Sequence, residues 1–289
     1  NCNPGRSGYE LALEAGRRVM AVREKLAAFF HVDDPHRVIF TQNITVALNF
    51  ALKGLLQEGD HVLITGLEHN AVVRPLASLA RERQISYSII PTDPQGFLDL
   101  DAVPGMIRPN TRMVVATHAS NVMGTLGPLE ELGKIAREAG LDFVVDTAQT
   151  AGCLPLDMQK IGATVLAFTG HKHLLGPVGI GGFVLTEEAA ARMKPLYEGG
   201  TGSVSDREEQ PAFPPDRFES GTLNALGIVG LGGALDYLVQ VGLDRIRAKE
   251  QALTRRLLEG LEEIPGVIIY GPKDAARQTG TVALNLREV

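Results

Sequence analysis

The sequence predicts an α/β protein built on a mostly parallel β-sheet with helices on both faces. Short apolar runs rich in Val and Ile recur along the chain, at 37–41, 61–65, 85–90, 112–118, 141–146, 164–169 and 181–186. Helical patterns separate many of these runs, at 44–56, 71–83, 129–139 and 187–194. Strands that are apolar almost throughout and alternate with helices are typical of a parallel sheet that is covered on both faces.

The regions outside this alternating pattern predict further elements. Segment 9–30 places apolar residues at helical spacing between charged ones, which indicates an amphipathic helix. Segment 198–222 is rich in Gly, Pro and Ser and predicts a long loop with a functional or interface role. Segment 223–264 reads as one or two helices, and 265–289 opens a further strand-containing unit. We therefore place a domain boundary near residue 223.

Composition narrows the classes of function. The chain has 289 residues and a net charge of −6, and basic residues do not cluster, so we expect no nucleic-acid partner. No apolar run approaches the ~20 residues that a membrane span needs, so we expect no membrane partner. With only Cys2 and Cys153, a disulfide framework is not expected, which favours a reducing, cytoplasmic location. The chain starts at Asn1 and stops within a strand pattern, as expected of a fragment.

Polar side chains gather at the ends of the predicted strands. Ligands of open α/β sheets bind beyond the carboxyl ends of the strands, so these residues are candidates for a site. They are Thr45, His69, Asn121, Asp146, Gln149 and Lys172. We find no spacing of His, Cys and acidic residues that indicates a zinc site, so we expect no bound metal.

Asp146 and Lys172 are the two strongest candidates. Asp146 ends the apolar run "FVVD", where a carboxylate is costly to desolvate unless a positive group such as a protonated pyridine nitrogen pairs with it. Lys172 lies between His171 and His173 in a loop rich in glycine, where its amine could bind a carbonyl group covalently. The alternatives are a helix N-cap or surface role for Asp146 and a solvated loop position for Lys172.

The other candidates also have two interpretations each. The stretch "TQNITVALNF" joins a strand to a helix start, where Thr45 could help to bind a phosphate or simply cap the helix. His69 could stack on a flat ring and relay protons, or serve as a capping or core residue. Asn121 and Gln149 could donate hydrogen bonds to a phenolic oxygen, or belong to a turn and to a helix start respectively.

Taken together, five stretches resemble one known family. They are "LEHNAVVRP", "THASNVMGTLGPL", "VVDTAQTAG", "FTGHKHLLGPVGIGGF" and "RFESGTLN". Their order and spacing resemble the class V aminotransferases, and within them the cysteine desulfurases and selenocysteine lyases. The resemblance implies the fold type I architecture of pyridoxal 5′-phosphate (PLP) enzymes, with a large seven-stranded domain, a small C-terminal domain and a homodimer. Residues 1–222 would form the large PLP-binding domain, its N-terminal segment incomplete, and 223–289 the start of a truncated small domain.

The resemblance also implies roles for individual residues. Lys172 matches the catalytic lysine that binds the cofactor covalently, and His69 the imidazole that stacks on the ring and transfers protons. Asp146 matches the partner of the pyridine nitrogen. Gln149 and Asn121 match hydrogen-bond donors to the cofactor or substrate. The remaining cofactor-binding positions are Ile44, the phosphate ligands Thr45, Thr169 and His171, and Thr222, which would reach the phosphate of the neighbouring subunit.

The expected activity is removal of sulfur from L-cysteine, which gives alanine and an enzyme persulfide for a sulfur-acceptor protein. The nucleophilic cysteine of this reaction would follow Val289. Cys153 lies in the wrong motif and is expected to pack as a small apolar side chain, while Cys2 is predicted to lie in a loop. "TQNIT" is bulkier than the family's phosphate loop. The alternatives are a class V aminotransferase or selenocysteine lyase that acts on another amino acid, and a non-catalytic α/β fragment that serves ligand binding or dimerisation.

Overall fold

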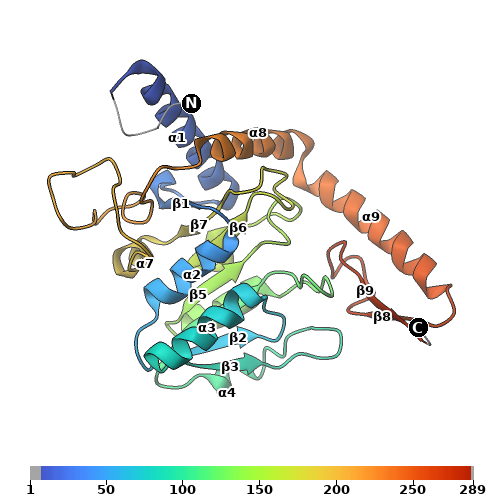
Figure 1. Cartoon of the computed structure of the whole chain (residues 1–289). Helices are drawn as coiled ribbons and strands as arrows, with labels where there is room; N and C mark the ends of the chain where they lie inside the picture. Colours follow the sequence, from blue (N-terminus) through green and yellow to red (C-terminus); the bar gives the residue numbers. More distant parts are fainter. Residues whose placement is uncertain (1–7, 288–289) are drawn as a thin grey trace.

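The computed structural model describes residues 8–287 and has a seven-stranded sheet at its centre (Figure 1). The strands lie in the order β1-β7-β6-β5-β4-β2-β3. Strand β7 is antiparallel to both of its neighbours, β1 and β6. Every other pair of neighbouring strands in this sheet is parallel. The bounds are β1 (Val38–Thr41), β2 (His61–Thr65), β3 (Ser86–Ile90), β4 (Thr111–Thr117), β5 (Asp142–Asp146), β6 (Val165–Thr169) and β7 (Gly181–Leu185). The prediction of a mostly parallel sheet is therefore confirmed.

Burial explains why the sequence showed these strands so clearly. Strands β1, β2, β6 and β7 are buried at every position. A strand covered on both faces has no solvent side, so it appears as a continuous apolar run. Strand β3 lies at the edge of the sheet and differs, because Ile89 is 56% exposed.

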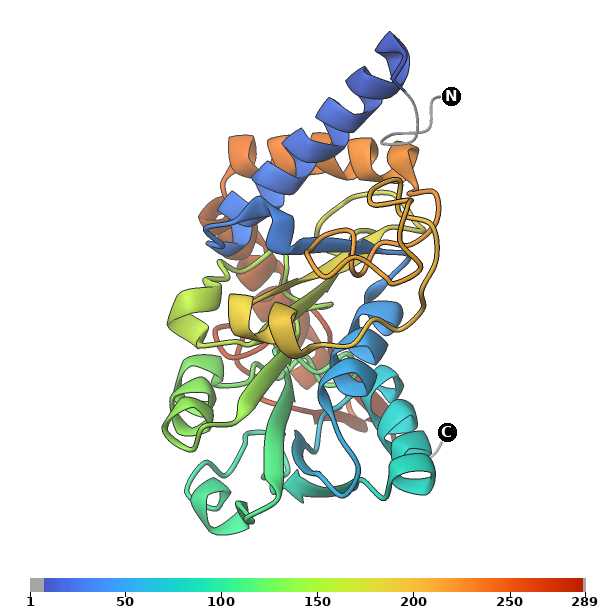
Figure 2. The same cartoon turned by 90° about the vertical axis from the view of Figure 1, so that its left-hand side faces the viewer.

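Helices cover both faces of the sheet. On one face, α2 (Ile44–Leu55), α3 (Asn70–Arg83) and α7 (Glu187–Arg192) share a core with the strands. On the other face, α1 (Glu10–Phe30), α5 (Leu129–Glu138) and α8 (Ala225–Val241) form a second core with them. Figure 2 shows blue-to-cyan α2 and α3 on one side of the sheet and green α5 on the other. The expected two-sided cover is confirmed.

Three short elements were not expected from the sequence. They are a 3-10 turn (Pro35–Arg37), α4 (Val103–Met106) and α6 (Met158–Ile161). Helix α6 is specified by a cap, because the Asp157 carboxylate accepts hydrogen bonds from the N–H groups of Gln159 and Lys160. An element of three or four residues is too short to show a period, so only its caps and turn residues could reveal it.

The C-terminal part leaves the sheet at Gly242, where α8 ends and α9 (Leu243–Glu262) begins. Helix α8 packs on α1, since a Cβ at Gly232 would crowd the Val22 side chain. Helix α9 then leads to the antiparallel hairpin of β8 (Val267–Tyr270) and β9 (Ala283–Leu286), as Figure 1 shows. The domain boundary near residue 223 stays a prediction, and α8 shares its core with the sheet.

Within residues 8–287, no single helix is long and apolar enough to cross a bilayer; α8 and α9 reach that length and composition only as a pair, bent by 79°. Much of the apolar face of α8 is occupied by its packing against α1, with Leu231, Leu235 and Leu238 buried.

Candidate functional site

A cavity of about 300 Å³ lies at the carboxyl ends of the parallel strands. Strand pairing places Thr117, the last residue of β4, beside Asp146, the last residue of β5. The cavity brings together every predicted site residue except Thr222. Its lining consists of Asn43, Ile44, Thr45, His69, Thr117, Ala119, Asn121, Asp146, Ala148, Gln149, Thr169, His171 and Lys172.

Asp146 is the buried acid of this cavity, with only 3% of its surface exposed. Its Oδ1 accepts a hydrogen bond of 2.8 Å from the Ala148 N–H. Burial raises the pKa of Asp146, against the opposing effects of this hydrogen bond and of the nearby Lys172 and His69 side chains. A carboxylate in this setting becomes easier to ionise when a further cation binds beside it. The structure thus does not support the surface alternative for Asp146.

Lys172 lies in the turn that connects β6 to β7. The backbone N–H of Gly176 donates to the carbonyl of Gly170, and Leu174 is completely buried below the turn. Gly152 follows β5 with a φ of 107°, and a Cβ there would overlap the backbone carbonyl of His173. Only glycine tolerates both conditions. The lysine turn therefore rests directly on the turn that follows Asp146.

The N-terminus of α2 also lines the cavity. The Asn43 side chain caps the helix by accepting a hydrogen bond of 3.1 Å from the Val46 N–H. Thr45 lines the cavity from the first turn of this helix. In the same cavity, the Thr169 hydroxyl lies 3.1 Å from Nδ1 of His171. A cavity lined by a helix N-terminus and by hydroxyl and imidazole groups is suited to an anion such as a phosphate.

His69 has the capping role that one of its two interpretations predicted, and its role toward a bound ring stays a prediction. Its Nδ1 accepts a hydrogen bond of 3.1 Å from the Ala71 N–H and caps α3, and the same residue lines the cavity. Because Nδ1 is the acceptor, the proton of the neutral ring lies on Nε2. The cap therefore fixes both the place of the ring and its tautomer.

Sequence reasoning missed Glu68, the residue before His69. Its Oε1 accepts hydrogen bonds from the Thr65 hydroxyl at 2.6 Å and from the Thr117 N–H at 2.7 Å. Burial and, to a lesser extent, nearby Asp146 raise its pKa to about 8, against the opposing effect of these hydrogen bonds. An acidic residue in a loop reads as solvated, so only its place between two strand ends could have drawn attention to it. Four residues that line the cavity were also missed, Asn43, Thr117, Ala119 and Ala148, and they are close sequence neighbours of predicted ones.

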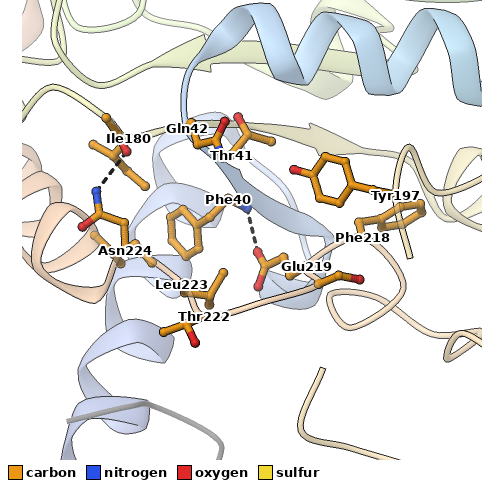
Figure 3. A pocket seen from close by; sticks show the side chains of 13 residues that line it. Phe40, Thr41, Gln42, Ile180, Tyr197, Phe218, Glu219, Thr222, Leu223 and Asn224 are labelled. Atoms are coloured by element: carbon orange, nitrogen blue, oxygen red, sulfur yellow. Dashed lines mark hydrogen bonds between the residues drawn. The ribbon is translucent and has the colours of Figure 1, made fainter. Parts of the chain in front are cut away.

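Thr222 lies elsewhere in the subunit, beside a smaller pocket of about 80 Å³ (Figure 3). It is exposed and does not line the cavity that contains Lys172. Its segment is held by Glu219, which pairs with Arg23 at 2.8 Å and accepts the Phe40 N–H at 2.6 Å. A role for Thr222 in a neighbouring subunit stays a prediction.

Cys153 is buried, as expected, with 1% of its surface exposed. Its thiol lies 3.5 Å from the backbone carbonyl oxygen of Thr150. Burial raises the pKa of this thiol to about 12, with a further contribution from Glu250. Cys153 therefore packs as a small apolar side chain. Cys2 lies outside the described residues.

Comparison with known proteins gives a consistent result. The Aminotransferase class-V family profile matches residues 1–289. A cysteine desulfurase of Serratia proteamaculans is 37% identical over 97% of this chain and 70% of its own length. The apo structure of a cysteine desulfurase from Thermococcus onnurineus NA1 matches with a TM-score of 0.93 at 34% identity, covering 99% of this chain and 72% of that one.

A third relative shows a cofactor. The structure of a C-DES mutant with glycine covalently linked to its PLP cofactor matches with a TM-score of 0.85 at 27% identity. The match covers 96% of this chain and 75% of that one. The family profile thus matches the whole chain, and the Serratia and Thermococcus relatives are both above 30% identity. The chain therefore belongs to the class-V aminotransferase family.

Proposed function

We propose that this protein is a PLP-dependent enzyme that removes sulfur from L-cysteine to give alanine and a persulfide. The observation that carries the proposal is the shared cavity of Lys172 and Asp146, each at the end of a neighbouring strand. The names of the Serratia and Thermococcus relatives favour cysteine as the substrate.

The residues of the cavity fit PLP. Burial raises the pKa of Asp146, so a protonated ring nitrogen beside it would supply the missing cation. The N-terminus of α2, with Thr45, Thr169 and His171, would hold the phosphate. Gln149 and Asn121 would donate to the ring oxygen and substrate. When bound, PLP supplies an electron sink for the negative charge that forms at the substrate's α-carbon.

The chain's own residues perform the proton transfers. Lys172 supplies the amine that holds the cofactor and then takes the α-proton of the substrate. Asp146 keeps its charge next to the ring nitrogen. His69 carries a proton on Nε2, because the Ala71 N–H occupies Nδ1, and this nitrogen can donate to a leaving or reacting group.

The last step of desulfuration needs a cysteine thiolate. Its sulfur bonds to the substrate sulfur while the substrate's carbon–sulfur bond breaks. Cys153 does not suit this step, because it is buried and the pKa of its thiol is about 12. The prediction that the reactive cysteine follows residue 289 stays a prediction, as do a sulfur-acceptor protein and a cytoplasmic location.

We also propose a homodimer. Leu175, Val178 and Leu226 are 58%, 78% and 80% exposed. The loop and helix that carry them are joined, since the Asn224 side chain donates to the Gly179 carbonyl at 2.9 Å. This exposed apolar surface adjoins Thr222, so a second subunit packed there would lie against the residue expected to cross the interface.

The test uses the Lys172→Ala variant beside the wild type and a Lys134→Ala control, whose side chain is 70% exposed. With added PLP, the wild type and the control should show visible absorbance, and protein that includes the predicted cysteine after residue 289 should produce alanine from cysteine. Borohydride treatment followed by peptide mass spectrometry should place the cofactor on Lys172. A wild-type protein that remains colourless and unmodified would contradict the proposal.

A further inference from the structure

The C-terminal part of the chain contacts the lysine turn through Glu250, which lies on α9. One oxygen of its carboxylate lies 3.6 Å from Nε2 of His173, the residue after Lys172. The same oxygen accepts the Gly280 N–H at 3.1 Å, and the other pairs with Arg247 at 2.8 Å. Only 16% of the Glu250 side chain is exposed. Three separate segments thus meet at one carboxylate.

Arg247 extends this cluster to the segment 275–281. Its Nη2 donates to the backbone carbonyls of Ala275 and Ala276, each at 3.1 Å. Together with the bond from Gly280 to Glu250, these contacts fasten the segment to α9. The segment cannot shift without breaking hydrogen bonds to a charged and largely buried pair.

The same segment also pairs with the loop that carries Asn121. The Thr279 N–H donates to the Gly124 carbonyl at 2.9 Å, and the Leu126 N–H donates to the Arg277 carbonyl at 3.0 Å. Gly124 has a φ of 74°, and a Cβ there would overlap the Thr281 carbonyl. The segment 275–281 is therefore in backbone contact with one loop of the cavity while Glu250 contacts another.

A metal site is the competing interpretation, because ligand atoms of Cys153, His173 and Glu250 lie within 4.8 Å of one another. Two observations oppose it. Glu250 is already paired with the Arg247 guanidinium, which would repel a cation. Burial also raises the pKa of the Cys153 thiol to about 12, so the thiol keeps its proton and is a poor metal ligand. Arg247, Gly280 and His173 already surround the Glu250 carboxylate without an ion.

We propose that Glu250 is a positioning residue that couples α9 and the segment 275–281 to the turn carrying Lys172. This inference rests on the function proposed above. The carboxylate is anionic across the physiological range. Burial alone would raise its pKa, but the contact with His173 and the hydrogen bonds from Arg247 and Gly280 outweigh burial and lower the pKa to about 2. Because Glu250 contacts His173, a movement of α9 would shift His173 and, through the backbone, Lys172.

The experiment is a double-mutant cycle with Glu250→Gln and His173→Gln, which preserve size and polarity. The matched control is Glu259→Gln, an exposed position on the same helix. The kcat/KM for cysteine, the KM, the rate of PLP release and the unfolding temperature of the PLP-free protein are measured for each variant. Each single variant should lower kcat/KM about threefold to tenfold with little change in KM, as expected for coupled neighbours. The rate of PLP release should increase. The double variant should have the same kcat/KM and the same rate of PLP release as the single variants.

Three results would overturn the inference. The first is a Glu250→Gln variant with the kcat/KM and PLP release of the control. The second is strict additivity of the two changes in both the activity and the unfolding temperature. The third is stoichiometric zinc in the purified protein that is lost in Cys153→Ala. A wild type that binds no PLP refutes the proposed function instead, and the unfolding cycle of the PLP-free protein still reports on the Glu250–His173 contact.

Discussion

Glu68 accepts the backbone N–H of Thr117 at 2.7 Å, and this bond joins the loop that carries His69 to the end of β4. The Thr65 hydroxyl donates to the same oxygen, Oε1, while Oε2 is buried and has no partner among residues 8–287. Two donors on one oxygen are the arrangement expected of a neutral carboxylic acid whose proton lies on Oε2. If Glu68 is neutral, Asp146 is the acidic residue that can form an ion pair with a cation bound in the cavity.

Replacing Glu68 with Gln should change how stability depends on pH. Folding raises the pKa of Glu68 from 4.5 to about 8, so between these values the unfolded chain is ionised while the folded one keeps its proton. The contribution of this group to stability is complete below pH 4.5 and is lost as the pH rises to 8, by at most about 1.4 kcal/mol per pH unit. In urea unfolding, the free energy of unfolding of Glu68→Gln relative to that of the wild type should therefore increase from pH 5 to pH 8. The exposed Glu24→Gln control should show the same pH dependence of unfolding free energy as the wild type. If Glu68→Gln also showed that dependence, Glu68 would be ionised in the folded protein.

The Asp146→Asn variant should keep its fold and its cavity but lose most of its activity. The amide preserves the size of the side chain and removes the charge that would hold the ring nitrogen protonated. We expect kcat/KM for cysteine to fall at least about 100-fold, the scale of a lost charge or proton-transfer group. Steady-state kinetics and visible spectra check this. Activity close to that of the wild type would mean that this acid does not support the ring.

Cys153→Ala should retain the desulfurase activity. The thiol is buried with a pKa of about 12, so it holds its proton at neutral pH and cannot attack sulfur. Stability should fall by about 1 kcal/mol because a small buried side chain is shortened. Iodoacetamide should leave Cys153 of the native protein unmodified at pH 8. Loss of sulfide release in this variant would identify Cys153 as the sulfur carrier after all.

Gly152→Ala should displace the lysine turn. The added Cβ would overlap the His173 carbonyl, and the φ of 107° disfavours any side chain. We expect a loss of more than about 1 kcal/mol in unfolding free energy together with weaker PLP binding. Gly233→Ala is the control, since nothing lies within 4 Å of a Cβ there and the residue is in α8. Equal behaviour of the two variants would show that the contact at Gly152 does not position Lys172.

Leu226→Arg should convert the proposed dimer to a monomer. An arginine at an 80% exposed position on an apolar interface would bring two charges against the partner surface. Analytical ultracentrifugation measures the change. Ile89→Arg, on the distant edge strand β3, is the control and should stay dimeric. A wild type that sediments as a monomer at micromolar concentration would refute the dimer.

The sequence predicted the sheet well because most of its strands have no solvent-facing side. Runs such as 61–65 and 181–186 could hardly be missed, since Val62, Leu63 and Phe183 are all completely buried. Most of the cavity followed from one rule, that parallel strands end at a common edge, together with the family resemblance. The three- and four-residue helices, in contrast, leave no period in the sequence.

The parts that escaped prediction depend on contacts between distant residues. Glu68 meets Thr117, and Glu250 meets His173, only after folding brings their segments together. Nothing in the local sequence of either glutamate marks it as buried. Gly152 is similar, because its role comes from a backbone that crosses it from another turn.

The reversed direction of β7 has a consequence for how this protein can vary. Thr169 pairs with Gly181, so the connection 170–180 departs from and returns to the same rim of the sheet. Residues inserted near Val178 would extend outward into solvent or toward a neighbouring molecule, leaving strand register and Lys172 where they are. The part of the connection near Val178 can therefore change in evolution, together with any surface it contacts, without a change in the cavity residues of the same connection.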